Sequence, residues 1–174
     1  MAREARTFSR IVEADAMIQA LCDKYPEVLW SVRPSTVAIM GVDNQERTEK
    51  AMKKNPVYAK LRPVKGAEKS IFQNNDIPIR FIVEMYWSDW HAWTSELKQM
   101  VIFNKMLEIS PEDEKRNSPD CVGFRILMDK VGVTWDISNG IGLPNLLQDD
   151  IKFDISLRPG LDTEEDDGGD SDEE

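Results

Sequence analysis

The sequence predicts an α+β fold in which a small mixed sheet packs against helices. The strongest strand signal is the run IRFIVEMYW at 79–87, which is rich in β-branched and aromatic residues. A long run of helix-forming residues follows it at 94–109. Near the N-terminus, apolar residues recur at helical spacing and predict a further helix. A length of 174 residues fits a single domain, which we assign to residues 1–161.

The N-terminal half alternates between helical and extended patterns. Ser9 is a helix-capping residue type, and we expect a helix from Ser9 to Lys24. The β-branched run at 36–42 predicts a strand, the charged run at 43–54 an exposed helix or loop, and residues 57–64 a second strand. The apolar stripe of the first helix consists of Ile11, Ala14, Met17, Ile18 and Leu21.

The C-terminal half is predicted to be mainly helical. Thr94 can cap the helix at 94–109, because a Thr side chain accepts a hydrogen bond from a first-turn N–H. A further helix is expected at 121–131, with Gly132 as its C-terminal cap. Alternating apolar and polar residues at 151–158 predict a short edge strand or an extended arm.

The negative charge is concentrated at the C-terminal end. The formal net charge is −10, but residues 162–174 hold nine acidic and no basic residues, which leaves 22 basic against 23 acidic residues elsewhere. Such a block repels itself and has little apolar surface to bury, so we expect a disordered tail. It serves either as a solubilising tail or as a partner-binding segment, whose acidic residues are Asp162, Glu164, Glu165, Asp166, Asp167, Asp170, Asp172, Glu173 and Glu174.

Residues 43–69 have the opposite charge, with eight basic against four acidic residues. This excess can contact nucleic-acid phosphates or the acidic tail, although interspersed Glu residues are typical of an ordinary charged surface. No apolar run is long enough to cross a membrane, and the charged N-terminus lacks a secretory signal. We therefore expect no membrane contact, and free thiols at Cys22 and Cys121.

Three stretches share a pattern of apolar and aromatic positions with a known family. They are LCDKYPEV at 21–28, FIVEMYWSDWHAWT at 81–94 with the helix that follows, and DCVGFRILMDKVGVTW at 120–135. Together they resemble the metallopeptidases encoded by bacteriophages, over roughly residues 9–135. The resemblance implies a zincin-like fold, in which a strand with a downstream Trp leads into a helix bearing H-E-x-x-H.

The resemblance also implies that the zinc site of the family is degenerate in this chain. H-E-x-x-H places two His on one helix face, with the Glu as general base for the metal-bound water. The only His of the sequence, His91, lies outside this motif. We therefore expect no catalytic residue, no metal and no cofactor. The positions that correspond to the two His, the Glu, the downstream His and the following Asp are Asn104, Glu108, Lys105, Pro119 and Asp120, respectively.

Two other groups of side chains are candidates for metal binding or catalysis. Glu108, Asp113 and Asp120 offer the oxygen donors that Mg²⁺ or Ca²⁺ prefers, although carboxylates after a helix end are typical of a solvated surface. His91 is a residue type suited to general base catalysis, but no nucleophile is evident beside it. A structural or surface role for His91 is the better interpretation.

These observations lead to three functional hypotheses. The favoured one is a non-catalytic phage protein, a pseudoenzyme on a zinc-less metallopeptidase-like scaffold, which binds a protein partner and uses its acidic tail for this. The second is a nucleic-acid-associated protein with an acidic regulatory tail, or a DNA-mimicking inhibitor. The third is an active hydrolase with a non-zinc site. The favoured hypothesis predicts a location in the host cytoplasm or in the virion.

Overall fold

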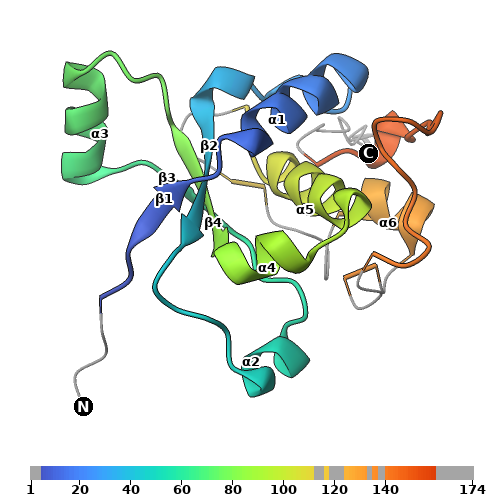
Figure 1. Ribbon diagram of the computed structural model, residues 1–174. Coiled ribbons are helices and arrows are strands. Elements are labelled where there is room, and N and C mark those ends of the chain that lie inside the picture. Colours follow the sequence, from blue (N-terminus) through green and yellow to red (C-terminus); the bar gives the residue numbers. More distant parts are fainter. Residues whose placement is uncertain (1–4, 112–115, 118–123, 133–134, 137–139, 160–174) are drawn as a thin grey trace, which may run out of the picture.

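The computed structural model describes residues 5–111, 116–117, 124–132, 135–136 and 140–159. Its centre is a four-stranded mixed sheet with strand order β1-β2-β4-β3 (Figure 1). The two central strands, β2 (Val37–Val42) and β4 (Phe81–Tyr86), run parallel. The two edge strands, β1 (Phe8–Arg10) and β3 (Lys60–Pro63), are antiparallel to their neighbours. The predicted class of fold, a small mixed sheet against helices, is confirmed.

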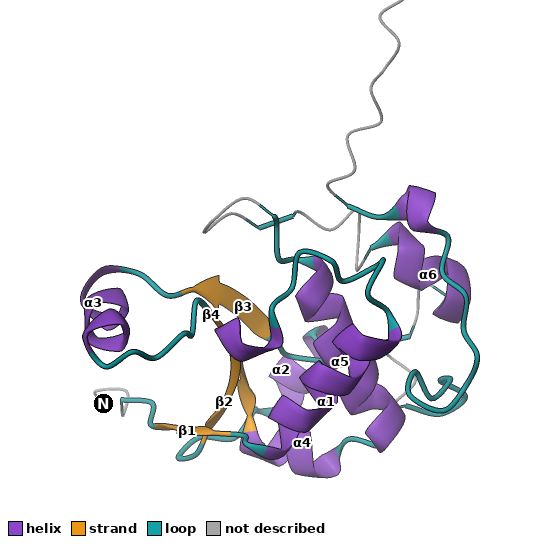
Figure 2. Ribbon diagram, turned by 90° about the horizontal axis from the view of Figure 1, so that it is seen from above, coloured by secondary structure: helices purple, strands orange, loops and turns teal. Residues whose placement is uncertain are grey.

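Helices cover the two faces of the sheet unequally. Figure 2 shows α1 (Glu13–Lys24), α4 (Trp87–Ala92) and α5 (Ser95–Leu107) on one side of the sheet and α3 (Gly66–Asn74) on the other. Side chains alternate between the faces of a strand, so Ile39 and Val83 enter the main core while Ala38 and Ile82 enter a small core beside α3. The remaining helices are α2 (Glu49–Lys54) and α6 (Arg125–Val131).

Helix α5 is the centre of the main core. Nine of its residues are buried, on nearly every side of the helix, as expected of a helix enclosed by other elements. Thr94 caps it as predicted, because its side chain accepts a hydrogen bond from Leu97 N at 3.2 Å. The predicted stripe is confirmed within α1, where Ala14, Ile18 and Leu21 are at most 1% exposed, and Ile11 is buried just before the helix begins.

The predicted start of the first helix at Ser9 was wrong. Ser9 lies in β1, opposite Gly41, and α1 begins only at Glu13. Pairing with β2 provides hydrogen-bond partners for the backbone of residues 8–10. Ile11 N extends this pairing by donating to Ile39 O at 2.9 Å. The sheet edge therefore competes successfully with helix formation for the residues that precede α1.

Other boundaries also differ from the predictions. Only Lys60–Pro63 of the predicted 57–64 strand pairs with a neighbour. Of the two alternatives predicted for residues 151–158, the edge strand is not formed, and the extended arm agrees with the structure, which adds a short 3₁₀ turn at Ile155–Leu157. A second 3₁₀ turn, Pro34–Thr36, precedes β2. Helix α6 is shorter than expected, since Phe124 precedes it in an extended conformation, but Gly132 caps it as predicted, with a positive φ of 82°.

Candidate functional site

The positions that the family resemblance assigns to zinc binding lie in the last turn of α5. Asn104 and Glu108 are four residues apart, share one helix face, and are 5% and 8% exposed. Lys105 Nζ donates to Glu108 Oε1, so a buried carboxylate is paired with a side-chain ammonium. A lysine cation therefore occupies the space beside these positions and neutralises the carboxylate at Glu108.

A small pocket of about 200 Å³ adjoins this turn, and we call it the α5 pocket. Asn104 is one of its walls, and Asp136 is another. Both residues carry a buried side-chain oxygen, Oδ1 in each case, that has no hydrogen-bond partner among the described residues. Trp135, which is 4% exposed, adds an aromatic wall. The complete lining is Asn55, Val57, Ala59, Val101, Asn104, Lys105, Trp135 and Asp136.

A buried ion pair holds the loop that closes the α5 pocket. Arg47 Nη1 donates to Asp89 Oδ2 at 2.8 Å, and the two side chains are only 4% and 7% exposed. The same guanidinium donates to the carbonyl oxygens of Pro56, at 3.0 Å, and of Asn55. Burial raises the pKa of the Asp89 carboxyl, while hydrogen bonding and charge from Arg47 oppose this rise. Arg47 thus fixes the Asn55–Ala59 wall of the pocket to α4.

The buried ion pair between Arg47 and Asp89 was not predicted from the sequence. Arg47 stands in a charged segment that we interpreted as exposed, and Asp89 stands in an aromatic run. The two residues are 42 positions apart in the sequence, so neither helical nor strand periodicity relates them. Only the position of the loop over α4 brings the two side chains together.

Several predicted site residues lie outside the described residues. These include Pro119, Asp120, Asp113, Cys121 and the whole acidic tail, with Asp162, Glu164, Glu165, Asp166, Asp167, Asp170, Asp172, Glu173 and Glu174. Of the proposed oxygen-donor set, only Glu108 is described, and it contacts Lys105. Within the ranges that the structure describes, no three His, Cys, Asp or Glu residues are grouped as a metal site would require.

The basic segment 43–69 does not form one surface. Figure 1 shows α2, which carries Lys50, Lys53 and Lys54, at one end of the molecule and α3 at another. Arg47 is buried, and Arg62 is engaged by Glu68 at 2.6 Å and Glu84 at 2.5 Å. The hypothesis of a continuous phosphate-binding stripe along this segment therefore loses its geometric basis.

The side chain of His91 is exposed and packs on an aromatic neighbour. Its ring stacks on Trp87, with 5.1 Å between the centroids and an interplanar angle of 25°. Trp90, in contrast, is 1% exposed and belongs to the main core. This arrangement agrees with the structural or surface role that we expected for His91.

The most distinctive exposed side chain is Trp30, which the sequence did not single out. It is 52% exposed, yet the guanidinium of Arg158 lies under its ring at 4.5 Å from the centroid. Arg158 is itself buried and donates to Val28 O at 2.6 Å and to Ser31 Oγ at 3.2 Å. Trp30 is therefore held in one position by a buried cation that is anchored to the backbone.

A hollow of about 300 Å³ opens beside Trp30. Arg33 and Arg80, both exposed, stand on its rim, and apolar side chains form its floor. We call this region the Trp30 surface and define it by Trp30, Ser31, Arg33, Thr36, Arg80, Phe81, Ile109, Ser110 and Pro111.

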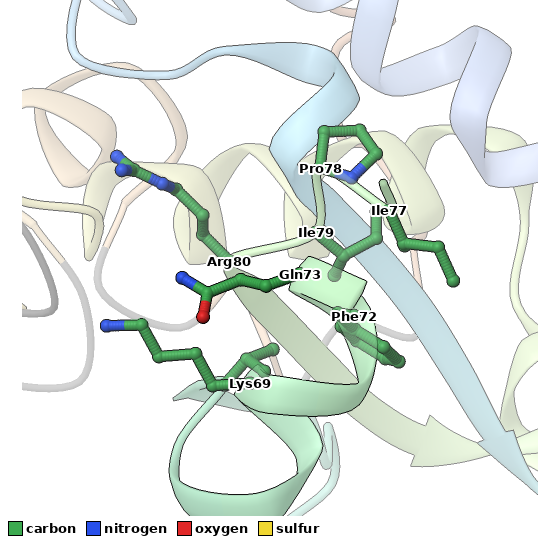
Figure 3. Close-up of a pocket in the computed structure, with 8 residues that line it drawn as sticks. Lys69, Phe72, Gln73, Ile77, Pro78, Ile79 and Arg80 are labelled. Atoms are coloured by element: carbon green, nitrogen blue, oxygen red, sulfur yellow. The ribbon is translucent and has the colours of Figure 1, made fainter. Parts of the chain in front are cut away.

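A second hollow, of about 230 Å³, continues from the Trp30 surface, because Arg80 lines both. Figure 3 shows the polar ends of Lys69, Gln73 and Arg80 projecting toward the same side of this hollow. Phe72 and Ile77 lie on its other side (Figure 3). In both hollows, apolar side chains form the floor and basic side chains stand at the edge.

Comparisons with protein-family models, with curated proteins and with solved structures find no match for this chain. Among the described helices, none combines the length and the apolar character needed to cross a bilayer.

Proposed function

We propose that this chain is a non-catalytic, phage-type protein on a zincin-like, zinc-less metallopeptidase scaffold, and that it acts by binding a protein partner. The arrangement at the end of α5 supports the non-catalytic part. An enzyme of this class needs a free carboxylate as base and neutral ligands around a cation. Here the Lys105 ammonium stands at that turn and is paired with Glu108.

The observation that carries the binding proposal is the exposed Trp30 on its buried Arg158 support. Trp and Arg are the residue types most enriched among the residues that dominate interface energy. A side chain that is already fixed loses little conformational entropy on binding, so more of its contact energy becomes affinity. Trp30 meets both conditions, because its guanidinium partner is held by Val28 O and Ser31 Oγ.

The margin of the Trp30 surface indicates the chemistry of the partner. Arg33, which is exposed, contributes positive charge beside an apolar floor that includes Phe81 and Ile109. A partner that fits this surface presents an apolar side chain surrounded by carboxylates. Nucleic acid is a poorer match, because the lysines of α2 and α3 lie apart (Figure 1).

Affinity capture from host cells tests the proposal with three baits. Wild-type protein should retain a specific partner, and Trp30→Ala should lose it without a change in thermal unfolding. Val12→Ser is the matched control, since Val12 is also strongly exposed, at 67%, but lies on α1's N-terminal side. A partner that Trp30→Ala retains at wild-type affinity would contradict the assignment of this surface.

Two further measurements separate the rival functions. Stoichiometric zinc in the purified protein, with proteolysis that a chelator blocks, would refute the non-catalytic proposal. Deletion of residues 162–174 tests the acidic tail: loss of the partner places binding on the tail, whereas a gain of salt-sensitive DNA or RNA binding supports the nucleic-acid hypothesis.

A further inference from the structure

The α5 pocket contains two buried oxygen atoms whose hydrogen-bonding capacity is unused. They are Asn104 Oδ1 and Asp136 Oδ1, and neither has a partner among the described residues. Asn104 is 5% exposed and lies on a buried helix, so its amide has little access to bulk water. Buried polar atoms in native proteins nearly always have a hydrogen-bond partner. Two acceptors without a partner in the same pocket therefore point to a ligand that donates hydrogen bonds.

The chemistry of the two acceptors restricts the ligand. An ionised carboxylate only accepts hydrogen bonds, so a ligand at Asp136 must donate. Asn104 Oδ1 is an amide carbonyl oxygen, which accepts hydrogen bonds and therefore also calls for a donor. Carboxylates and other groups that only accept hydrogen bonds therefore do not fit this pocket.

The balance of charges at the pocket favours a ligand with a single positive charge. Lys105 and Glu108 neutralise each other through their ion pair, so Asp136 has no cationic partner among the residues that the structure describes. A single positive charge on the ligand restores neutrality, whereas a divalent ion leaves an excess beside the Lys105 ammonium. Mg²⁺ also requires six oxygen ligands in octahedral geometry.

The aromatic wall and the size of the pocket favour a guanidinium. Planar guanidinium groups stack on aromatic rings and donate through several N–H groups in a fixed fork, which suits two separate acceptors. Trp135 supplies the ring. A volume of about 200 Å³ admits such an end group but is below the range of roughly 300–1,000 Å³ that is usual for whole small-molecule ligands.

We infer that the α5 pocket binds the guanidinium group of an arginine side chain supplied by another molecule, with Asp136 and Asn104 as acceptors and Trp135 as the stacking surface. The pocket shares no residue with the Trp30 surface, and the inference goes beyond the proposed function. It adds a second contact, for a positively charged group, at a separate place on the protein.

Titration of the isotope-labelled full chain, followed by NMR, tests the inference. The probe is N-acetylarginine amide, and the reporters are the Asn104 side-chain amide and the Trp135 indole N–H. We expect saturable shifts at both reporters. N-acetylcitrulline amide, which has nearly the same shape but no charge, should leave them unchanged. Equal shifts with citrulline, or saturable MgCl₂ binding that displaces arginine, would overturn the inference.

Three variants sharpen the test. Asp136→Asn should weaken arginine binding by at least about tenfold, a change of ~1.4 kcal/mol. Asp129→Asn is the matched control, because it removes the same charge from an exposed position on α6. Asn104→Asp should strengthen binding by adding a second charge at the acceptor position. Wild-type affinity in both Asp136→Asn and Asn104→Asp would overturn the inference even where the pocket remains folded.

Discussion

Arg47 and Asp89 form a buried ion pair that joins the loop after β2 to helix α4, with 2.8 Å between Nη1 and Oδ2. Because Arg47 also binds the carbonyl oxygens of Asn55 and Pro56, the pair fixes the loop wall of the α5 pocket. Helix α2 has no buried residue, and in the loop that follows it Val57 and Ala59 pack only partly buried against the main core. The stability of the region therefore depends strongly on one electrostatic contact.

Asp89→Asn should destabilise the protein by about 3–5 kcal/mol, because it leaves the Arg47 guanidinium buried without a counter-charge. Urea unfolding measures the loss. The control is Asp15→Asn, which breaks the surface pair Arg10–Asp15 at 3.0 Å, where the side chains are 45% and 36% exposed. We expect about 0–1 kcal/mol for that variant. Equal losses in the two variants would contradict the role of the buried pair.

A second ionic contact predicts a pH dependence. Arg62 grips both carboxylate oxygens of Glu68, at 2.6 and 3.0 Å, and these hydrogen bonds lower the pKa of Glu68. A carboxyl whose folded pKa is depressed contributes stability that is complete above its unfolded pKa and is lost as pH falls through the folded pKa. The contribution is small, because both side chains are about one-third exposed.

The Glu68→Gln variant isolates this contribution. Its unfolding free energy should fall below that of wild type near neutral pH, and the difference should vanish as the pH is lowered through the acidic range. Urea unfolding at a series of pH values measures the difference. Glu27→Gln, at an exposed position before β2, is the control and should show a smaller pH-dependent difference. A Glu68→Gln difference that stays constant with pH would exclude the assigned cause.

The sequence predicted the elements whose local pattern agrees with their packing. The runs at 36–42 and 79–87 contain the two central strands, because a buried parallel pair requires continuous β-branched and aromatic residues. The second strand ends at Tyr86, and Trp87 begins helix α4, which was not predicted. Thr94 marked the start of α5 correctly. These signals are local and strong, so contacts with distant residues did not alter the secondary structure that they predict.

The failures occurred where distant contacts decide. Ser9 is a residue type that often caps helices, but in the structure it pairs with the edge of β2 as part of β1. Helix α3 carries no apolar stripe that reaches the main core, and the sequence did not indicate it. The support of Trp30 by Arg158 spans 128 residues, and no pattern along the chain records such a contact. For the α5 pocket, the resemblance located Asn104 and Lys105 but gave no role to Asp136.

The thiol of Cys22 should react slowly in the folded protein. Desolvation, with a smaller effect from Asp23, raises the pKa of Cys22 from 9.0 to about 11. Because only the thiolate is nucleophilic, alkylation by iodoacetamide at about pH 8 should be about 100-fold slower than in the unfolded chain. Mass spectrometry of the Cys22 peptide measures both rates. Equal rates would show that the thiol is not held in the apolar surroundings described.

Gly41 predicts a steric coupling between β2 and α4. A Cβ atom at this position would overlap the Trp87 ring, whose Nε1 donates to Ser9 Oγ at 2.6 Å. Gly41→Ala must displace that ring and should cost about 1–3 kcal/mol, as overpacking in a well-packed region does. In a Trp87→Ala background the same change meets no ring, so its cost should fall markedly. A double-mutant cycle by urea unfolding measures this coupling. An equal cost of Gly41→Ala in both backgrounds would mean that strand geometry, rather than contact with Trp87, requires glycine at this position.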